Sequence, residues 1–477
     1  MHRLLLILIT FLALTACEDI LNKEPLGQLS EGNFFQTSHD AVQGINAAYQ
    51  YLLFNNDNKN FYWAFGTVTS DDAIAGGDGS RPGIVELDFL THTARTEEFN
   101  DFWRVNYAGI TQCNSVLENV PVIDMDEGLK NQILGEALFL RAYYYFNLAQ
   151  VFGDVPLMTQ ILPPNELKIP RTPVAEILNQ VSTDCKAAAE LLPVQYTANA
   201  DIGRATRGAA YALAAKAALY QKDWNSVLEN VGKVKSLGVY ALVTDYEDNF
   251  RKDTQNNSES VWEIQHANLE LGVGNFLNQW WASKKFSTGY GFAEVTQDFV
   301  DAFEPGDPRR KFTVAMNNEP YFGLVYKPSY SSTGYGVRKY LQSDAEVSQK
   351  SDGDINYGAI RYAEVLLWEA EALANLGQVQ EAQAPLEEVR ARARAQADDP
   401  DNTLPVVTTT VQQEMLEAIR HERRVELGFE MHRFFDLVRW GQAAEKLPGF
   451  VPGKNEVFPL PQTEMDLNPM LVQNQGY

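Results

Sequence analysis

Two stretches of this chain align with each other without a gap: Ala218-Leu219-Tyr220-Gln221-Lys222-Asp223-Trp224-Asn225-Ser226-Val227 and Leu373-Ala374-Asn375-Leu376-Gly377-Gln378-Val379-Gln380-Glu381-Ala382. The first belongs to an alanine-rich run, residues 205–228, that is typical of a helix which lets a neighbour approach closely. A turn in the middle of each stretch would fold two helices back on one another. We therefore expect a packed helical hairpin at both places.

Both stretches look like tetratricopeptide hairpins, in which a small residue on one helix receives a large residue from the next. Each such pair buries only part of its apolar face and needs neighbouring pairs to cover the rest. The two copies lie far apart in the chain, so they do not form a regular array. We predict a mainly α-helical protein in which tetratricopeptide-like hairpins form a scaffold interrupted by long insertions.

Further helices are indicated between the N-terminal region and the first hairpin. Apolar residues recur at steps of three and four from Ile133 to Val151, which predicts a long amphipathic helix that ends before Gly153 and Pro156. A second helix is predicted from Thr172 to Leu192, with Thr172 as the cap and Pro173 in the first helical position.

Two segments, about residues 54–97 and 240–356, lack helical periodicity. Both are rich in glycine, asparagine, serine and aromatic residues. We expect loops with short strands there, inserted into a single domain that covers residues 17–477. Long loops held by a rigid scaffold are where binding sites usually lie. We therefore expect the ligand site in these two insertions.

The N-terminus resembles the signal peptide of a bacterial lipoprotein. An apolar run from Leu4 ends in Leu14-Thr15-Ala16-Cys17, which predicts removal of residues 1–16 and lipid on the Cys17 thiol. Each acyl methylene placed in hydrocarbon contributes about 0.8 kcal/mol, so two or three chains would hold the protein on the membrane. Glu18 and Asp19 resemble the signal that directs such lipoproteins to the outer face of the outer membrane in Bacteroidetes. An ordinary signal peptide with a chance cysteine is the alternative.

The composition is that of a globular protein with an acidic surface. Hydrophobic residues make up 45% of the chain, and the formal net charge is −24. Such a charge repels phosphate backbones, so nucleic acid is not an expected partner, and neutral ligands suit the chain better. Besides Cys17 there are Cys113 and Cys185, which are too few for a disulfide framework and either pair or stay free.

The C-terminal half carries a run of charged and aromatic residues, Ile419-Arg420-His421-Glu422-Arg423-Arg424-Val425-Glu426-Leu427-Gly428-Phe429-Glu430, followed by Arg433-Phe434-Phe435-Asp436-Leu437-Val438-Arg439-Trp440-Gly441. Other matching segments are residues 141–146, 152–157, 303–309, 361–367, 458–461 and 473–477. Together they resemble the SusD/RagB family over nearly the whole mature chain. Met431, Leu460 and Gln475 depart from the residues usual in that family.

The resemblance implies four tetratricopeptide-like hairpins and a lipid anchor at the cell surface. It also implies a role as the cap of a TonB-dependent outer-membrane transporter of the SusC type, for which the protein captures a nutrient, usually a glycan. Some relatives serve peptide uptake, so a peptide-capturing protein of the RagB type is the second hypothesis. A surface glycoside hydrolase or lyase is the third.

The sequence marks no catalytic, cofactor or metal centre. Glu422, Glu426 and Glu430 stand at four-residue steps among arginines, which favours a structural network of ion pairs over a catalytic site. Glycoside hydrolysis needs two carboxyl groups about 5 to 10 Å apart, and no local pattern marks such a pair. Residues 352–356 open like a calcium loop but lack its later ligands.

A sugar has an apolar face and a rim of hydroxyl groups, so its binding site needs exposed aromatic rings beside short polar side chains. Both insertions offer this mixture. The ligand-binding candidates are Trp63, Asp71, Asp72, Asp78 and Arg81 in the first insertion, and Asn278, Trp280, Trp281 and Tyr290 in the second. If Trp280 and Trp281 lie in a strand, they point to opposite sides and at most one faces ligand. Asp71 and Asp72 are alternatively turn or cap residues.

Overall fold

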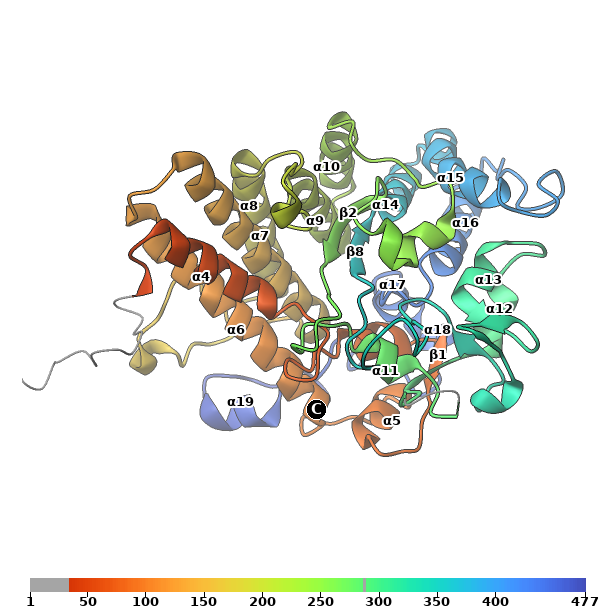
Figure 1. Ribbon diagram of the computed structural model, residues 1–477, viewed down its shortest axis with the longest axis horizontal. Coiled ribbons are helices and arrows are strands. Elements are labelled where there is room, and N and C mark those ends of the chain that lie inside the picture. Colours follow the sequence, from red (N-terminus) through yellow and green to blue (C-terminus); the bar gives the residue numbers. More distant parts are fainter. Residues whose placement is uncertain (1–33, 286–288) are drawn as a thin grey trace, which may run out of the picture.

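The computed structural model describes residues 34–285 and 289–477. The predicted cleavage site and Cys17 lie outside these residues. The described chain is mainly helical, and its long helices follow one another across the molecule (Figure 1). The scaffold helices are α4 (Ser38–Gln50), α6 (Glu97–Asn119), α7 (Glu127–Phe152), α8 (Val174–Leu191), α9 (Arg207–Tyr220), α10 (Trp224–Ser236), α14 (Tyr362–Asn375), α15 (Val379–Arg394) and α16 (Gln412–Glu426).

The two aligned stretches are helical hairpins, as predicted. One joins α9 to α10 and the other joins α14 to α15, and the two hairpins pack on each other through α10 and α14. Their turns are also equivalent, because Lys222 and Gly377, which align, both have the left-handed backbone conformation, with φ of 58° and 78°. The same chain reversal is thus made once with glycine and once with lysine.

Helix α7 differs from the amphipathic helix that was predicted. From Phe139 to Phe152 every residue is buried, because α4, α6, α8 and α9 surround this part of the helix. The helix ends at Gly153, whose φ is 72°, as the glycine predicts. Helix α8 begins at Val174, and its N-terminal backbone amide donates to Asp154 Oδ1 at 2.7 Å, so Asp154 supplies the cap that was expected from Thr172.

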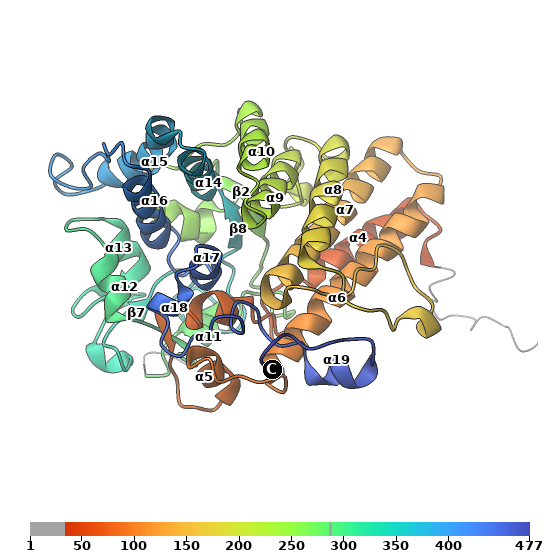
Figure 2. The ribbon, with the colours of Figure 1, turned by 180° about the vertical axis from the view of Figure 1, so that it is seen from behind.

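The insertions carry short elements and pack together on one side of the helical scaffold (Figures 1 and 2). The first contains a π-helical turn (Ala64–Val68), β1 (Ala73–Ala75) and α5 (Pro82–Asp88). The second contains β2 (Ser260–Ile264), α11 (Leu277–Trp281), β3 (Ala293–Val295), α12 (Gln297–Ala302), α13 (Arg309–Thr313), β4 (Val314–Ala315), β5 (Pro320–Tyr321), β6 (Leu324–Val325) and β7 (Gly336–Val337). Antiparallel pairing of β1 with β3 joins the two insertions directly.

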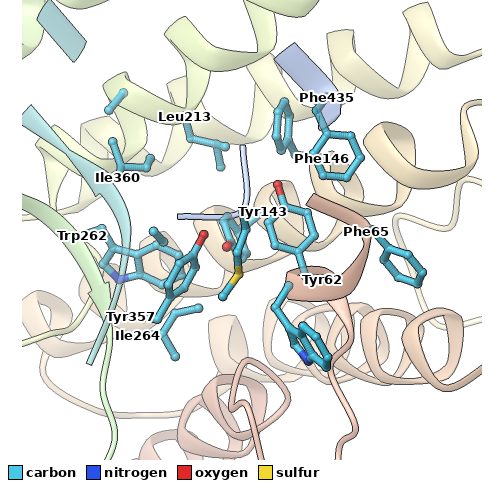
Figure 3. Packing of buried hydrophobic residues seen from close by; sticks show 14 of the residues in the cluster. Tyr62, Phe65, Tyr143, Phe146, Leu213, Trp262, Ile264, Tyr357, Ile360 and Phe435 are labelled. Atoms are coloured by element: carbon cyan, nitrogen blue, oxygen red, sulfur yellow. The ribbon is translucent and has the colours of Figure 1, made fainter. Parts of the chain in front are cut away.

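Strand β2 pairs with β8 (Tyr357–Arg361), which leads into α14, and this ribbon joins the second insertion to the scaffold. Trp262 of β2 packs its ring against Phe139 and Tyr143 of α7, with ring centroids 4.7 and 4.9 Å apart. Figure 3 shows these strands and helices meeting in one apolar core. After α16 the chain forms α17 (Arg433–Arg439), α18 (Ala443–Lys446) and α19 (Gln462–Leu467).

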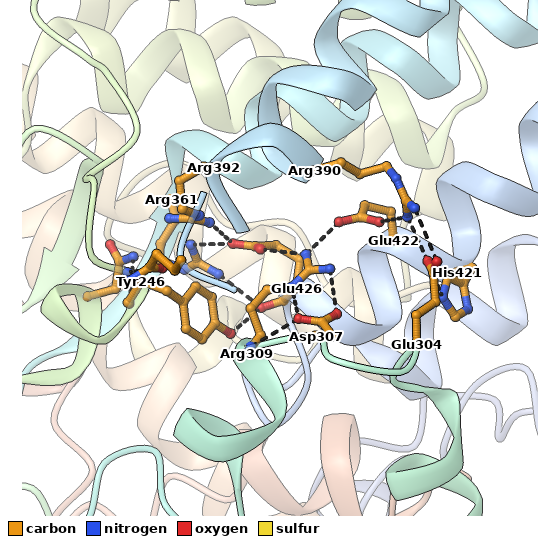
Figure 4. A network of polar contacts seen from close by, with 12 residues as sticks. Tyr246, Glu304, Asp307, Arg309, Arg361, Arg390, Arg392, His421, Glu422 and Glu426 are labelled. Carbon is orange, nitrogen blue, oxygen red and sulfur yellow. Dashed lines mark hydrogen bonds and ion pairs between the residues drawn. The ribbon is translucent and has the colours of Figure 1, made fainter. Parts of the chain in front are cut away.

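A buried network of ion pairs lies where the second insertion, β8, α15 and α16 meet (Figure 4). Glu426, at the end of α16, accepts from Arg309 Nη1 at 3.0 Å, from Arg361 Nη1 at 3.1 Å and from Arg392 Nη2 at 2.5 Å. Its side chain is fully buried. Burial opposes ionisation, but Arg392, Arg361 and Arg309 outweigh it and hold the pKa of Glu426 well below its usual range.

Glu422 and Glu430 belong to the same network. Glu422 pairs with Arg309 and Arg390, and Glu430 pairs with Arg361 and Lys339. The glutamates at four-residue steps therefore face arginines from three other segments of the chain. Their predicted structural role is confirmed by these contacts.

The equivalent turns make a first prediction about stability. The Lys222→Gly variant removes a left-handed lysine, so we expect its free energy of unfolding to rise by about 1 kcal/mol. The Gly377→Ala variant should lower it by a similar amount, because a Cβ at Gly377 meets no atom within 4 Å and the cost is purely conformational. Chemical denaturation measures the free energy of unfolding of both variants. If both variants were stabilised, or both destabilised, to the same extent, the two turns would not be equivalent.

A second prediction concerns the network. Glu426→Gln leaves buried arginines without their shared counter-charge, so we expect a loss of about 3–5 kcal/mol at pH 7. Because the folded pKa of Glu426 is depressed, this contribution exists above the ordinary glutamate pKa and disappears on acidification. The deficit should therefore shrink as the pH falls below about 4.

The control is Glu229→Gln, which removes an exposed partner of Lys233 in α10 and should cost roughly 0–1 kcal/mol. Denaturant unfolding across pH separates the two variants. A Glu426→Gln protein as stable as the control would show that the network does not hold the insertion to the scaffold.

Candidate functional site

A pocket of about 530 Å³ lies between the two insertions. Its walls combine one segment around α5 and the start of α6 with a second segment around α11 and β3. The lining residues are Asn56, Ser80, Arg81, Pro82, Gly83, Glu86, Thr93, Arg95, Thr96, Glu97, Glu98, Trp280, Tyr290 and Phe292. Three of the predicted ligand-binding residues, Arg81, Trp280 and Tyr290, therefore meet in one place.

The aromatic wall of the pocket comes from the second insertion. The side chain of Tyr290 is 38% exposed, and its ring lies 5.2 Å from that of Phe292. Trp280 is 4% exposed and stacks on Trp63 behind it, at 5.4 Å between centroids. Tyr290 thus offers an accessible ring that a rigid aromatic cluster supports from behind.

The polar wall comes from the first insertion and α6. The Arg81 guanidinium lies over the Phe61 ring, 4.4 Å from its centroid, and Arg81 Nε donates to Glu98 Oε1 at 2.7 Å. Burial raises the pKa of Glu98, and the charge of Arg81 opposes this rise. Asn56, Ser80 and Thr93 are exposed and add uncharged polar groups to the lining.

Asp78 lies just outside the pocket lining, next to Ser80. Asp78 Oδ2 accepts from Lys284 Nζ at 2.5 Å, which links the two insertions at the surface. This hydrogen bond is the main reason that the pKa of Asp78 lies below its usual range. Asp78 is therefore placed to hold the loops on either side of the pocket.

Asp71 and Asp72 bond to arginines of the scaffold helices. Asp71 receives two hydrogen bonds of 2.7 Å from Arg433 of α17, and Asp72 receives one of 2.7 Å from Arg424 of α16. Burial raises the pKa of Asp72 to about 6, whereas for Asp71 the bonds from Arg433 outweigh burial and lower the pKa. The two carboxylates tie the first insertion to the scaffold and do not line the pocket.

Trp63, Trp281 and Asn278 also lie inside the protein. Trp63 is 0% exposed and Trp281 is 3% exposed. Asn278 is fully buried and holds the loop at Gln342 and Lys350 by accepting from one backbone amide and donating to one carbonyl. None of the three offers a face to a ligand in this structure, which corrects their assignment.

The tryptophan pair differs from prediction in its backbone. Trp280 and Trp281 lie in the short helix α11 and not in a strand, so their side chains diverge by about 100° and not by 180°. Both directions lead into aromatic clusters, and only Trp280 borders the pocket. The expectation that at most one of them faces ligand stays a prediction.

Sequence reasoning missed Glu98 and Phe292. Phe292 stands two residues after Tyr290, and residues at that spacing share one face of an extended segment, which was the available signal. Glu98 lies in the first turn of α6, where an acidic residue is ordinary for a helix N-terminus. No sequence signal separates that role from its position in the pocket wall.

The calcium-like segment and the two cysteines noted in the sequence lie within the described residues. Asp352, from the calcium-like segment, accepts from the backbone amides of Glu270 and Gly274. Cys113 and Cys185 are buried free thiols whose pKa values are raised by burial. Within residues 34–285 and 289–477, no group of His, Cys, Asp and Glu is arranged to hold a metal ion, and no helix is long and apolar enough to cross a membrane.

Comparison with known proteins gives consistent matches over the chain. Residues 243–457 match the model of the SusD family, and residues 40–219 match a model described as starch-binding associating with outer membrane. A SusD-like protein of Formosa agariphila is 27% identical over 99% of this chain and 98% of its own length.

Solved structures agree with these matches. A laminarin-binding SusD-like protein is 29% identical, with a TM-score of 0.80 over 93% of this chain and 100% of its own. Surface glycan-binding protein A of Bacteroides fluxus is 26% identical, with a TM-score of 0.79 over 93% of this chain and 100% of its own. The two family models together, with the agreement in fold, show that this chain belongs to the SusD-like family.

Proposed function

We propose that this protein binds a nutrient glycan in the pocket between its two insertions and passes it to a transporter without chemical change. The observation that carries the proposal is the accessible Tyr290 ring, which packs against Phe292 and lines the same pocket as Arg81. A sugar ring can lay its apolar face on such an aromatic platform while its hydroxyl groups bond to the polar wall.

The names of related proteins support this ligand class. One structural relative is described as laminarin-binding and another as a surface glycan-binding protein, and both share the fold over more than nine-tenths of this chain. The acidic net charge of −24 also suits an uncharged ligand better than a polyanion.

The contacts of Glu98, the buried carboxyl group of the pocket, support binding over hydrolysis. A glycosidase acid needs a raised pKa and a position from which it can give its proton to the glycosidic oxygen. Burial raises the pKa of Glu98, but its Oε1 already accepts from Arg81 Nε at 2.7 Å, an interaction that favours the ionised form. We therefore assign Glu98 to shaping the polar wall.

The N-terminal sequence and the family support a location and a partner. Removal of residues 1–16 and lipidation of Cys17 would tether a single domain, residues 17–477, to the outer membrane. The family resemblance points to a TonB-dependent transporter of the SusC type, which the helical scaffold would cover. Co-purification of such a transporter with the native protein from solubilised membranes supports this pairing, and its absence contradicts it.

Calorimetry with the soluble mature chain against polysaccharide and oligopeptide panels tests the ligand class. Binding of a glycan without the appearance of cleavage products supports the proposal. Binding of oligopeptides alone would assign the protein to the peptide-capturing group. Release of shorter sugars would replace the binding role with a catalytic one.

Removal of the exposed ring gives a sharper test. We expect Tyr290→Ala to weaken glycan binding by about 1–3 kcal/mol, the scale of a lost aromatic contact, with the melting temperature nearly unchanged because the ring is partly exposed. Phe89→Ala is the matched control, since Phe89 is 64% exposed and does not line the pocket. If both variants bind as the wild type does, Tyr290 is not part of the site.

The lipid anchor is tested separately. The Cys17→Ala variant cannot carry lipid on a thiol, so we expect the protein to move from the outer-membrane fraction to the soluble fraction. Cell fractionation with immunodetection measures this. A variant that stays with the outer membrane would contradict the anchor.

A further inference from the structure

The cations in the pocket wall are already surrounded by carboxylates. Arg81 donates to Glu98 at 2.7 Å, and its Nη2 lies 3.9 Å from Asp101 Oδ2 and 4.0 Å from Glu97 Oε2. Lys59, beside it, lies 3.5 Å from Glu97 and 3.8 Å from Asp101. Two cations thus face three carboxylates, and the group as a whole carries a net negative charge.

Burial makes this arrangement hard to reverse. The side chain of Glu98 is 1% exposed and that of Asp101 is 10% exposed, so neither carboxylate can swing into solvent to free Arg81 for another anion. Gly83 contributes as well, because a Cβ there would lie 1.9 Å from Glu98 Oε2. The missing side chain at Gly83 gives the Glu98 carboxylate its place beside the pocket.

Glu97 is the member of this group that meets solvent. Its side chain is 66% exposed, and it lines the pocket at the first residue of α6. Glu86 adds another carboxylate to the lining, and it accepts from the Thr96 hydroxyl at 2.5 Å. Arg95 is the remaining cation among the lining residues, and it is exposed as Glu97 is, so the carboxylates of the lining outnumber its cations by three to two.

We propose that this pocket selects uncharged glycans and rejects those that carry uronate or sulfate groups, with Glu97 as a specificity-determining residue. This inference rests on the proposed glycan-binding function and adds the ligand's charge. A carboxylate or sulfate placed in the pocket would meet Glu97 and Glu86, whereas the charge of Arg81 is already balanced by Glu98 and only Arg95, at the rim, is left to oppose them. The hydroxyl groups of a neutral sugar can bond to Asn56, Ser80 and Thr93 without electrostatic repulsion from these carboxylates.

The test compares one glycan in two charge states. Laminarin and starch oligosaccharides are prepared both unmodified and with their primary hydroxyl groups oxidised to carboxylates, and binding is measured by calorimetry at low and high salt. We expect the oxidised form of any glycan that binds to be at least about tenfold weaker at low salt, with a smaller difference at high salt. A panel of natural uronate and sulfated oligosaccharides is included.

Charge reversal at Glu97 provides the matched variant. Glu97→Lys should bring the oxidised glycan to within a few-fold of the neutral one, while affinity for the neutral glycan changes little. Glu127→Lys is the control, because Glu127 is also the first residue of its helix and is 76% exposed, but it lies outside the pocket. Both variants place the same charge at a helix N-terminus, and the melting temperature of each is measured, because Glu97 lies beside Lys59 and Arg81 whereas Glu127 pairs with Lys130.

The outcomes separate the inference from the proposed function. If an anionic glycan binds the wild type as tightly as its neutral form, or if Glu97→Lys behaves like Glu127→Lys, the charge selection is overturned and glycan binding stands. If no glycan of either kind binds, both fail.

Discussion

The structure depends on the buried charges around Glu426. One carboxylate at the end of α16 is shared by arginines from α13, β8 and α15, so it links the second insertion to the scaffold beside the pairing of β2 with β8. Burying these charges costs free energy because each one loses its hydration, and the cost is offset only when the carboxylate and its arginines are all present. The network therefore favours one arrangement of these segments over others that bury the same apolar surface.

The first insertion is held by a similar device. Asp71 and Asp72 reach Arg433 and Arg424 on the same stretch of chain that carries Glu426, and β1 pairs with β3 of the second insertion. The two insertions are thus fixed to one support and to each other. The pocket lies where the two insertions meet, and the Asp78–Lys284 ion pair lies beside it. A binding site assembled from distant loops can be rigid for this reason.

The scaffold could be predicted from the sequence because its determinants are local. A turn between two packed helices repeats with a left-handed residue at the same position, and α7 ends at Gly153, as its glycine predicted. The site was predictable only in part. Aromatic and polar composition selected Arg81, Trp280 and Tyr290, which line one pocket, but it also selected Trp63, which is buried, and Asp71 and Asp72, which bond to arginines of the scaffold. Whether a loop residue faces ligand or a distant arginine is decided by tertiary contacts, which composition does not contain.

The most direct test of the account is a crystal structure of the mature chain with the oligosaccharide that binds it most tightly. We expect a sugar ring stacked on Tyr290, with hydroxyl groups within hydrogen-bond distance of the polar wall around Arg81. A sugar bound elsewhere would contradict the central claim, for example in the pocket lined by Tyr196, Tyr240 and Asn257 on another part of the molecule. The same would be true of a complex in which the ring of Tyr290 makes no contact with ligand.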